Sequence, residues 1–288
     1  MRFLSISVLL FAGCTRQIYE PLDTAETGDS DADTDADTDS DTDSDTDADT
    51  DADGDPNCHP YEPISYANWQ KHFTVNYKGS AGTEDQKGFG SFGNSFAVKT
   101  TLSASGGGGW DGNSFFDCDS GGAYVDRFEG TFTTPSDGVD HAVTATDNPH
   151  RKFLPAPSAI SDVNATWHYS YSYDITSSDS GAGTLAIATV GDYTNYGFED
   201  NVDVGMPCPS SASCGTGANA GKWNDVLWIH NVYTQTPSQD LIDNGFTAVT
   251  AQQDVYYAEG IGLIKEVTVD DATQEVIISK DLATASGF

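Results

Sequence analysis

The stretch Asn164-Ala-Thr-Trp-His-Tyr-Ser-Tyr-Ser-Tyr-Asp-Ile-Thr-Ser-Ser178 decides the fold class. From Trp167 onward, aromatic or aliphatic residues occupy the odd positions and small or polar residues occupy the even ones. Successive side chains of a strand point to opposite faces of a sheet, so this alternation predicts a strand with one buried aromatic face. The row consists of Trp167, Tyr169, Tyr171 and Tyr173. A platform for a sugar or lipid ligand is the alternative interpretation of the same row.

Further short strands are expected along the chain, separated by turns rich in Gly, Asn and Asp. They are 95–102, 127–133, 141–146, 184–190, 226–234, 246–257, 262–269 and 274–279. Residues 59–72 are expected to hold one short helix, which Pro60 and Pro63 keep brief. Many short strands with little helix predict an all-β domain. It is either an antiparallel sandwich or a strongly curved sheet that approaches a half-barrel.

The first 13 residues have the pattern of a secretory signal peptide, with Arg2, an apolar run and then small residues. The stretch Leu10-Phe11-Ala12-Gly13-Cys14 resembles the lipobox of bacterial lipoproteins, although Phe11 stands where a lipobox usually has Leu. This resemblance implies that Cys14 carries the acyl chains, palmitate among them, and that the protein is anchored to a membrane. Because Thr15 follows in place of Asp, the expected location is the outer membrane of a Gram-negative bacterium, facing the periplasm or the cell surface.

Aspartate occupies every odd position from Asp29 to Asp55. Residues 29–55 have no bulky apolar residue to bury and carry charges that repel one another, so residues 14–57 are expected to form a disordered, extended linker. Residues 58–288 are expected to form a single all-β domain. The stretch Asp49 to Gly54 matches the opening of a calcium-binding EF-hand loop, but Pro60 stands where the loop needs Glu. No cofactor and no specific metal site are therefore expected, and any Ca²⁺ would be bound only loosely.

The domain beyond the linker is acidic in its own right. Residues 1–56 hold 17 of the 45 acidic and two of the 12 basic residues, which leaves 28 acidic and 10 basic residues and a net charge of −18. Nucleic acids need a basic surface, so the sequence argues against them as partners, and against anionic lipid headgroups for the same reason. Such a charge discourages self-association and favours a monomer.

Four cysteines follow Cys14, and an even number in an exported protein indicates two disulfides. Cys208 and Cys214 enclose only five residues, so we pair them and infer a second bond between Cys58 and Cys118. A zinc site is disfavoured because the chain has no CxxC pair and no His near the Cys208–Cys214 loop.

No catalytic constellation stands out in the sequence. The motif Gly88-x-Gly90-x-x-Gly93 matches a dinucleotide fingerprint, but a strand-like run follows it where a helix is needed, so it is interpreted as a turn. The six histidines are scattered and are interpreted as surface or locally bonded residues. The chain is therefore predicted to be non-enzymatic. A carboxylate pair of the glycosidase type remains an alternative in so acidic a protein.

The stretch Val255-Tyr-Tyr-Ala-Glu-Gly-Ile-Gly-Leu-Ile-Lys265 resembles a motif of bacterial envelope lipoproteins, in which two strands flank a Gly-x-Gly turn. Gly260 and Gly262 would form that turn or a bulge. Some related envelope proteins hold lipid in a half-barrel. The resemblance thus implies a lipid-anchored protein whose β domain binds an apolar or lipid ligand, or a protein partner. A secreted carbohydrate-binding module or hydrolase with an aromatic platform is the alternative function.

Overall fold

The computed structural model describes residues 59–62, 69–92, 95–104, 109–133, 140–177, 184–243 and 247–288. Within these ranges twelve strands form a single sheet. The strands are β1 (Gln70–Tyr77), β2 (Ser80–Phe92), β3 (Ser95–Ala104), β4 (Gly109–Asp119), β5 (Gly122–Thr133), β6 (Asp140–Pro155), β7 (Thr166–Ser177), β8 (Thr184–Glu199), β9 (Val226–Pro237), β10 (Val249–Ala258), β11 (Gly262–Asp270) and β12 (Val276–Ser286).

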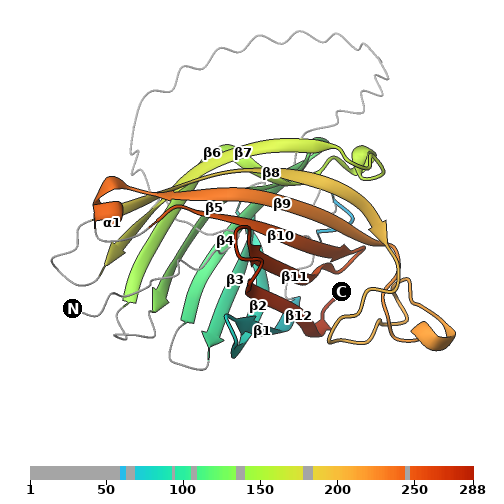
Figure 1. Cartoon of the computed structure of the whole chain (residues 1–288). Coiled ribbons are helices and arrows are strands. Elements are labelled where there is room, and N and C mark those ends of the chain that lie inside the picture. The colour runs from blue at the N-terminus through green and yellow to red at the C-terminus, as the bar shows by residue number, and fades with distance from the viewer. Residues whose placement is uncertain are drawn as a thin grey trace, which may run out of the picture.

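The sheet is a closed antiparallel barrel (Figure 1). Each strand pairs with its neighbours in the sequence, and β12 closes the barrel by pairing with β1, with Gln70 opposite Ser286 and Tyr77 opposite Ile278. Of the two expected arrangements, the strongly curved sheet is therefore the one that forms, and it closes completely. Helical structure in the described part is limited to α1 (Gln239–Asp243) and the 3₁₀ turns η1 (Pro157–Ala159) and η2 (Gly217–Asn219). None of these helices is long and apolar enough to cross a membrane.

The strands expected from the alternation are all present in the sheet. In β7, Tyr169 and Tyr173 are buried while Ser170 and Ser172 are exposed, so the aromatic row faces the barrel interior as predicted. Several strands are longer than expected, and β8 and β6 each reach 16 residues. The barrel supplies the reason for β8, because it has a hydrogen-bonded neighbour on both sides along most of its length. β6 pairs with β5 along most of its length, but with β7 only from His141 to Ala145.

The described part of residues 59–72 holds no helix, and residues 63–68 of that expected helix lie outside the described residues. Residues 60 and 61 form a turn, and β1 begins at Gln70. From there, Lys71, Phe73 and Val75 are buried, while Thr74 and Asn76 are exposed. This alternation is that of a strand, and the lysine at an inward position hides it from a search for apolar periodicity.

The turn expected at Gly88 and Gly90 is also wrong, because β2 runs through both residues; Gly93 lies outside the described residues. The Gly88 amide donates to the carbonyl oxygen of Trp69 at 3.1 Å. A Cβ at position 88 would lie 2.6 Å from Nε1 of Trp69, so glycine lets the indole lie against the strand. The rejection of a dinucleotide site is unaffected, since no helix follows.

The predicted Gly-x-Gly turn joins β10 to β11. Gly260 and Gly262 have φ angles of 72° and 80°, in the left-handed region that glycine enters without strain. A shift of register between Tyr256 and Tyr257 adds a bulge just before the turn. After it, Ile264 is fully buried.

Buried apolar side chains fill much of the interior, including Phe73, Ile187, Ile229, Ile264 and Leu282. The predicted signal peptide, Cys14, the acidic linker and Cys58 lie outside the described residues and stay predictions.

Candidate binding site inside the barrel

A buried lysine lies between two buried glutamates in the barrel interior. The Lys280 ammonium on β12 is 3.1 Å from Oε2 of Glu84 on β2 and 3.2 Å from Oε2 of Glu266 on β11. Their exposed fractions are 5%, 0% and 3%. Burial lowers the pKa of Lys280, but the two carboxylates outweigh it and hold that pKa well above its ordinary value. Gln86 donates to Oε1 of Glu84 at 2.8 Å, which satisfies a further oxygen of the group.

Hydrogen bonds extend this cluster along the barrel wall to β7. Gln253 on β10 donates to Oε1 of Glu266 at 3.0 Å and accepts from Asn231 on β9 at 3.1 Å. The Tyr169 hydroxyl donates to Oδ1 of Asn231 at 3.2 Å. Tyr169 reaches across β8 because Gly191 opposes it; a Cβ there would lie 2.7 Å from the hydroxyl oxygen. These contacts form a continuous polar chain along the inner wall of the barrel, from β2 through β12, β11, β10 and β9 to β7.

Beside this chain lies a cavity of about 90 Å³ inside the barrel. Its aromatic walls come from six rings of different strands and of the segment before β1: Trp69, Trp110, Phe116, Phe153, Tyr193 and Tyr257. Six charged side chains also line it: Glu62, Lys71, Glu84, Arg151, Glu266 and Lys280. The cavity therefore combines apolar faces with charges of both signs, which is typical of sites that hold and orient a small polar molecule.

The turn at residues 59–62 places Glu62 at the cavity. The backbone amide of Tyr61 donates to Nδ1 of His59 at 3.2 Å, so Nε2 carries the proton and donates to the Pro155 carbonyl at 2.9 Å. Burial lowers the pKa of His59, in keeping with this neutral tautomer. The Pro60 carbonyl accepts from the Gly260 amide at 2.8 Å. The turn is thereby bound both to the end of β6 and to the β10–β11 turn.

Glu62 and Lys71 form a second pair of buried charges, with exposed fractions of 9% and 2%. Burial raises the pKa of Glu62 to about 7, although attraction to Lys71 opposes the shift. Burial likewise lowers the pKa of Lys71 to about 8, against the attraction of Glu62. Within the described part of the chain, neither side chain makes a hydrogen bond or ion pair. Both side chains thus line the cavity without a hydrogen bond or close ion pair from the described residues.

The aromatic row predicted as a ligand platform does not line this cavity. Tyr169 and Tyr173 are buried, and Trp167 and Tyr171 are half-buried. The Arg151 guanidinium lies 4.7 Å from the ring centre of Tyr171 and 5.9 Å from that of Tyr169. The row therefore packs inside the barrel as its core face.

The predicted bond between Cys208 and Cys214 is present. Cys118 is buried and disulfide-bonded, and its expected partner Cys58 lies outside the described residues, so that pairing stays a prediction. Lipidation of Cys14 stays a prediction for the same reason. Among the residues that the structure describes, no three His, Cys, Asp or Glu side chains converge as metal ligands.

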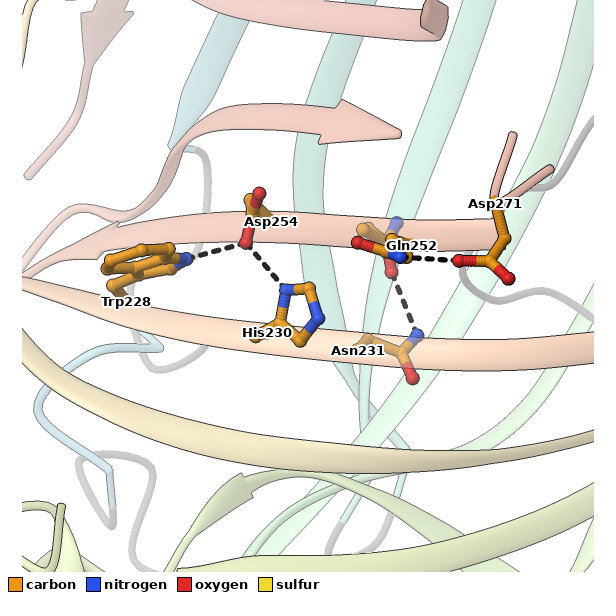
Figure 2. Close-up of polar contacts among 7 residues, drawn as sticks. Trp228, His230, Asn231, Gln252, Asp254 and Asp271 are labelled. Carbon is orange, nitrogen blue, oxygen red and sulfur yellow. Dashed lines mark hydrogen bonds and ion pairs between the residues drawn. The ribbon is translucent and has the colours of Figure 1, made fainter. Parts of the chain in front are cut away.

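A second cluster, on the outer face of β8 to β10, was not anticipated. Asp254 accepts from Nε1 of Trp228 at 2.7 Å and from Nδ1 of His230 at 2.8 Å (Figure 2). Tyr196 stacks on the His230 ring at a centroid distance of 5.0 Å, and Tyr256 stacks on Trp228 at 5.8 Å. We call this cluster the outer aromatic strip (Tyr196, Trp228, His230, Tyr256 and Asp254). The one sequence signal that could have indicated it is the presence of Trp228 and His230 at even positions of β9.

Comparison with known proteins assigns this chain to no family. No protein-family model matches the chain, and no curated protein matches it. Among solved structures, it resembles a protein from Bacteroides fragilis, described as a candidate exported protein with a YmcC-like fold. The TM-score is 0.45 and the identity 10%, over 76% of this chain and 96% of the other. At this identity and TM-score, nothing about function follows from the likeness.

Proposed function

We propose that the protein is a non-enzymatic, lipid-anchored envelope protein whose barrel binds a small ligand in its internal cavity. The cavity, with aromatic walls and charged side chains, is the observation that carries the proposal. A volume of about 90 Å³ is well below the roughly 300–1,000 Å³ of pockets for drug-sized ligands. The sequence favoured an apolar or lipid ligand, or a protein partner. The cavity supports a compact ligand with polar groups better than an acyl chain.

Anchorage is supported by the sequence, through the lipobox-like Cys14 and the acidic linker that follows it. In this proposal, lipid fixes the chain to the outer membrane, the linker sets the distance, and the barrel carries the ligand. Replacement of Cys14 by Ser should move the protein from the membrane fraction to the soluble fraction. Retention of the Cys14→Ser variant in washed membranes would exclude the anchor.

Ligand binding can be tested with a variant that fills the cavity. Val98 is buried and lines it, whereas Val232 is on the outer face of β9 and partly exposed. A library of small polar and apolar compounds is screened for a rise in the melting temperature of the mature full-length chain. The rise should disappear in Val98→Phe and persist in Val232→Phe. If no compound stabilises the wild type, or if Val98→Phe leaves the rise intact, the cavity is not the binding site.

The outer aromatic strip supports a second candidate, carbohydrate binding. Aromatic faces stack on sugar rings, and carboxylates accept hydrogen bonds from sugar hydroxyls; here Tyr196 is 38% exposed beside Asp254. In affinity electrophoresis through gels that contain neutral polysaccharides, the wild type should be retarded and Tyr196→Ala should migrate freely. Equal migration of both proteins in every gel would dismiss this candidate.

A further inference from the structure

The two sets of buried charges around the cavity differ in how they are compensated. Lys280 has a carboxylate oxygen within about 3.2 Å on either side, so that cluster is complete without a ligand. Glu62 and Lys71 face the same cavity and make no hydrogen bond or ion pair within the described ranges. Both side chains are more than nine-tenths buried, and burial opposes the charge of each, so this end of the cavity is the part that a ligand would complete.

The surroundings of Lys71 supply rings but no acceptor. Its ammonium is 5.0 Å from the ring centre of Trp69 and 5.7 Å from that of Phe288, so it lies close to two aromatic rings. Nε1 of Trp69 is buried and has no hydrogen-bond acceptor in the described part of the chain. Lys71 and Trp69 both line the cavity, and each carries a donor that has no acceptor among the described residues, so an anionic oxygen group is the chemistry that fits them.

Glu62 needs a hydrogen-bond donor, whereas Lys71 needs an acceptor. Its carboxylate accepts no hydrogen bond from the described residues, and the aromatic ring of Tyr257 lines the cavity beside it. An ammonium group would donate to the carboxylate and lie against the negative face of a ring. Within this end of the cavity, the side of Lys71 thus suits an anion and the side of Glu62 suits a cation.

The overall charge of the lining narrows the ligand class. Three acidic side chains and three basic ones line the cavity, so its formal charge is zero, although residues 57–288 carry a net charge of −18. A ligand with a single charge would leave the cavity with an uncompensated charge in a water-poor interior. A ligand with one charge of each sign leaves the total at zero and supplies a partner to both Glu62 and Lys71.

We infer that the cavity binds a small zwitterion, with its anionic group at Lys71 and Trp69 and its ammonium group at Glu62. This inference rests on the proposed ligand-binding function and names the ligand class. The volume of about 90 Å³ limits the molecule to a few heavy atoms, about the size of a small free amino acid.

The test compares matched probes on the mature full-length protein by isothermal titration calorimetry. Glycine and L-alanine carry both charges, acetate and propionate only the negative one, ethylamine only the positive one, and glycolamide neither. At least one zwitterion should bind about tenfold or more tightly than each partner that lacks a charge. Lys71→Met and Glu62→Gln should each weaken zwitterion binding by about tenfold or more. Lys265→Met, on the outer face, should leave it unchanged.

The possible outcomes distinguish the zwitterion inference from the broader proposal that the cavity binds a small ligand. The uncharged or singly charged probes could bind as tightly as the zwitterions, with all binding lost in Val98→Phe. That result would overturn the zwitterion inference but leave the cavity as a binding site. Binding of no probe and of no library compound would overturn both. Because single charge removal can unfold a buried site, the double variant Glu62→Gln/Lys71→Met provides a folded, neutral cavity. If that variant binds zwitterions as tightly as the wild type does, the inference is wrong.

Discussion

Replacement of Lys280 by Met should be among the most destabilising single changes in the barrel. The substitution preserves most of the volume but leaves Glu84 and Glu266 buried with no cation between them. Removal of one partner from a buried charge cluster costs about 3–5 kcal/mol. Since whole domains are stable by only about 5–15 kcal/mol, this is a large share of the total.

Lys265→Met is the matched control. Lys265 lies on the neighbouring strand β11, where its ammonium is 3.2 Å from Asp281 and its side chain is 25% exposed. Loss of a partly exposed pair of this kind costs about 0–1 kcal/mol. Urea unfolding of both variants at pH 7.5, followed by circular dichroism, gives the comparison directly. Equal losses in the two variants would refute the assignment of Lys280 as the centre of a buried cluster.

The pH dependence of the stability of Lys280→Met provides a second test of the buried cluster. In Lys280→Met the two carboxylates are buried with no cation between them, so the folded state disfavours their charged forms. Protonation at low pH removes these charges and with them the cost of burying them. The deficit of the variant should therefore shrink at about pH 4.5 and be largest at neutral pH. Adding Glu84→Gln and Glu266→Gln should recover much of it at pH 7.5.

Three further outcomes are expected. Burial raises the pKa of Glu62 from 4.5 to about 7 and lowers that of Lys71 from 10.5 to about 8. The free energy of unfolding should thus fall between pH 4.5 and 7 and rise again above pH 8, and each change should be at most about 3 kcal/mol. Urea unfolding of the wild type and of Glu62→Gln/Lys71→Met measures this, because the difference in stability between the two proteins should show the same minimum. Gly191→Ala should lose about 1–3 kcal/mol in the same assay, because the new methyl displaces the tyrosine ring that it faces. Serine at both Cys208 and Cys214 should lower stability by about 2 kcal/mol, the loop-closure contribution of a seven-residue ring, and a larger loss would mean that the loop's packing depends on the bond.

The fold class could be predicted from the sequence because one strand, β7, carries an almost unbroken aromatic alternation. The three strands that were missed, β1, β2 and β4, lack that signal. In β1 the inward series begins with Lys71, and in β2 it includes Glu84 and Gln86. In β4 glycines interrupt it, and Gly112 leaves room for the indole of Trp110. These residues have low strand propensity, and their pairing with stronger neighbours determines their conformation.

The interior site could not be predicted for the same reason. A charged residue at every second position reads as the solvent face of a strand, and nothing local distinguishes an inward Glu266 or Lys280 from an outward Lys265 or Asp281. Which face is inside depends on the register, and the register is fixed by the whole closed sheet. The residues that meet in the cavity lie as far apart in sequence as Glu62 and Lys280.

The width of the barrel explains why its interior is polar at all. Side chains can just fill a barrel of about eight strands, whereas about 16 strands leave an open channel, so twelve strands enclose more space than aliphatic side chains alone can fill. Long polar side chains such as Lys280 and Gln253 reach inward from opposite walls, and their hydrogen bonds satisfy one another. Packing therefore accounts for the compensated chain from β2 to β7. It does not account for Glu62 and Lys71, whose charges burial opposes and which make no hydrogen bond or ion pair among the described residues. The proposal that the cavity is a binding site, and not only part of the packed interior, thus rests on Glu62 and Lys71.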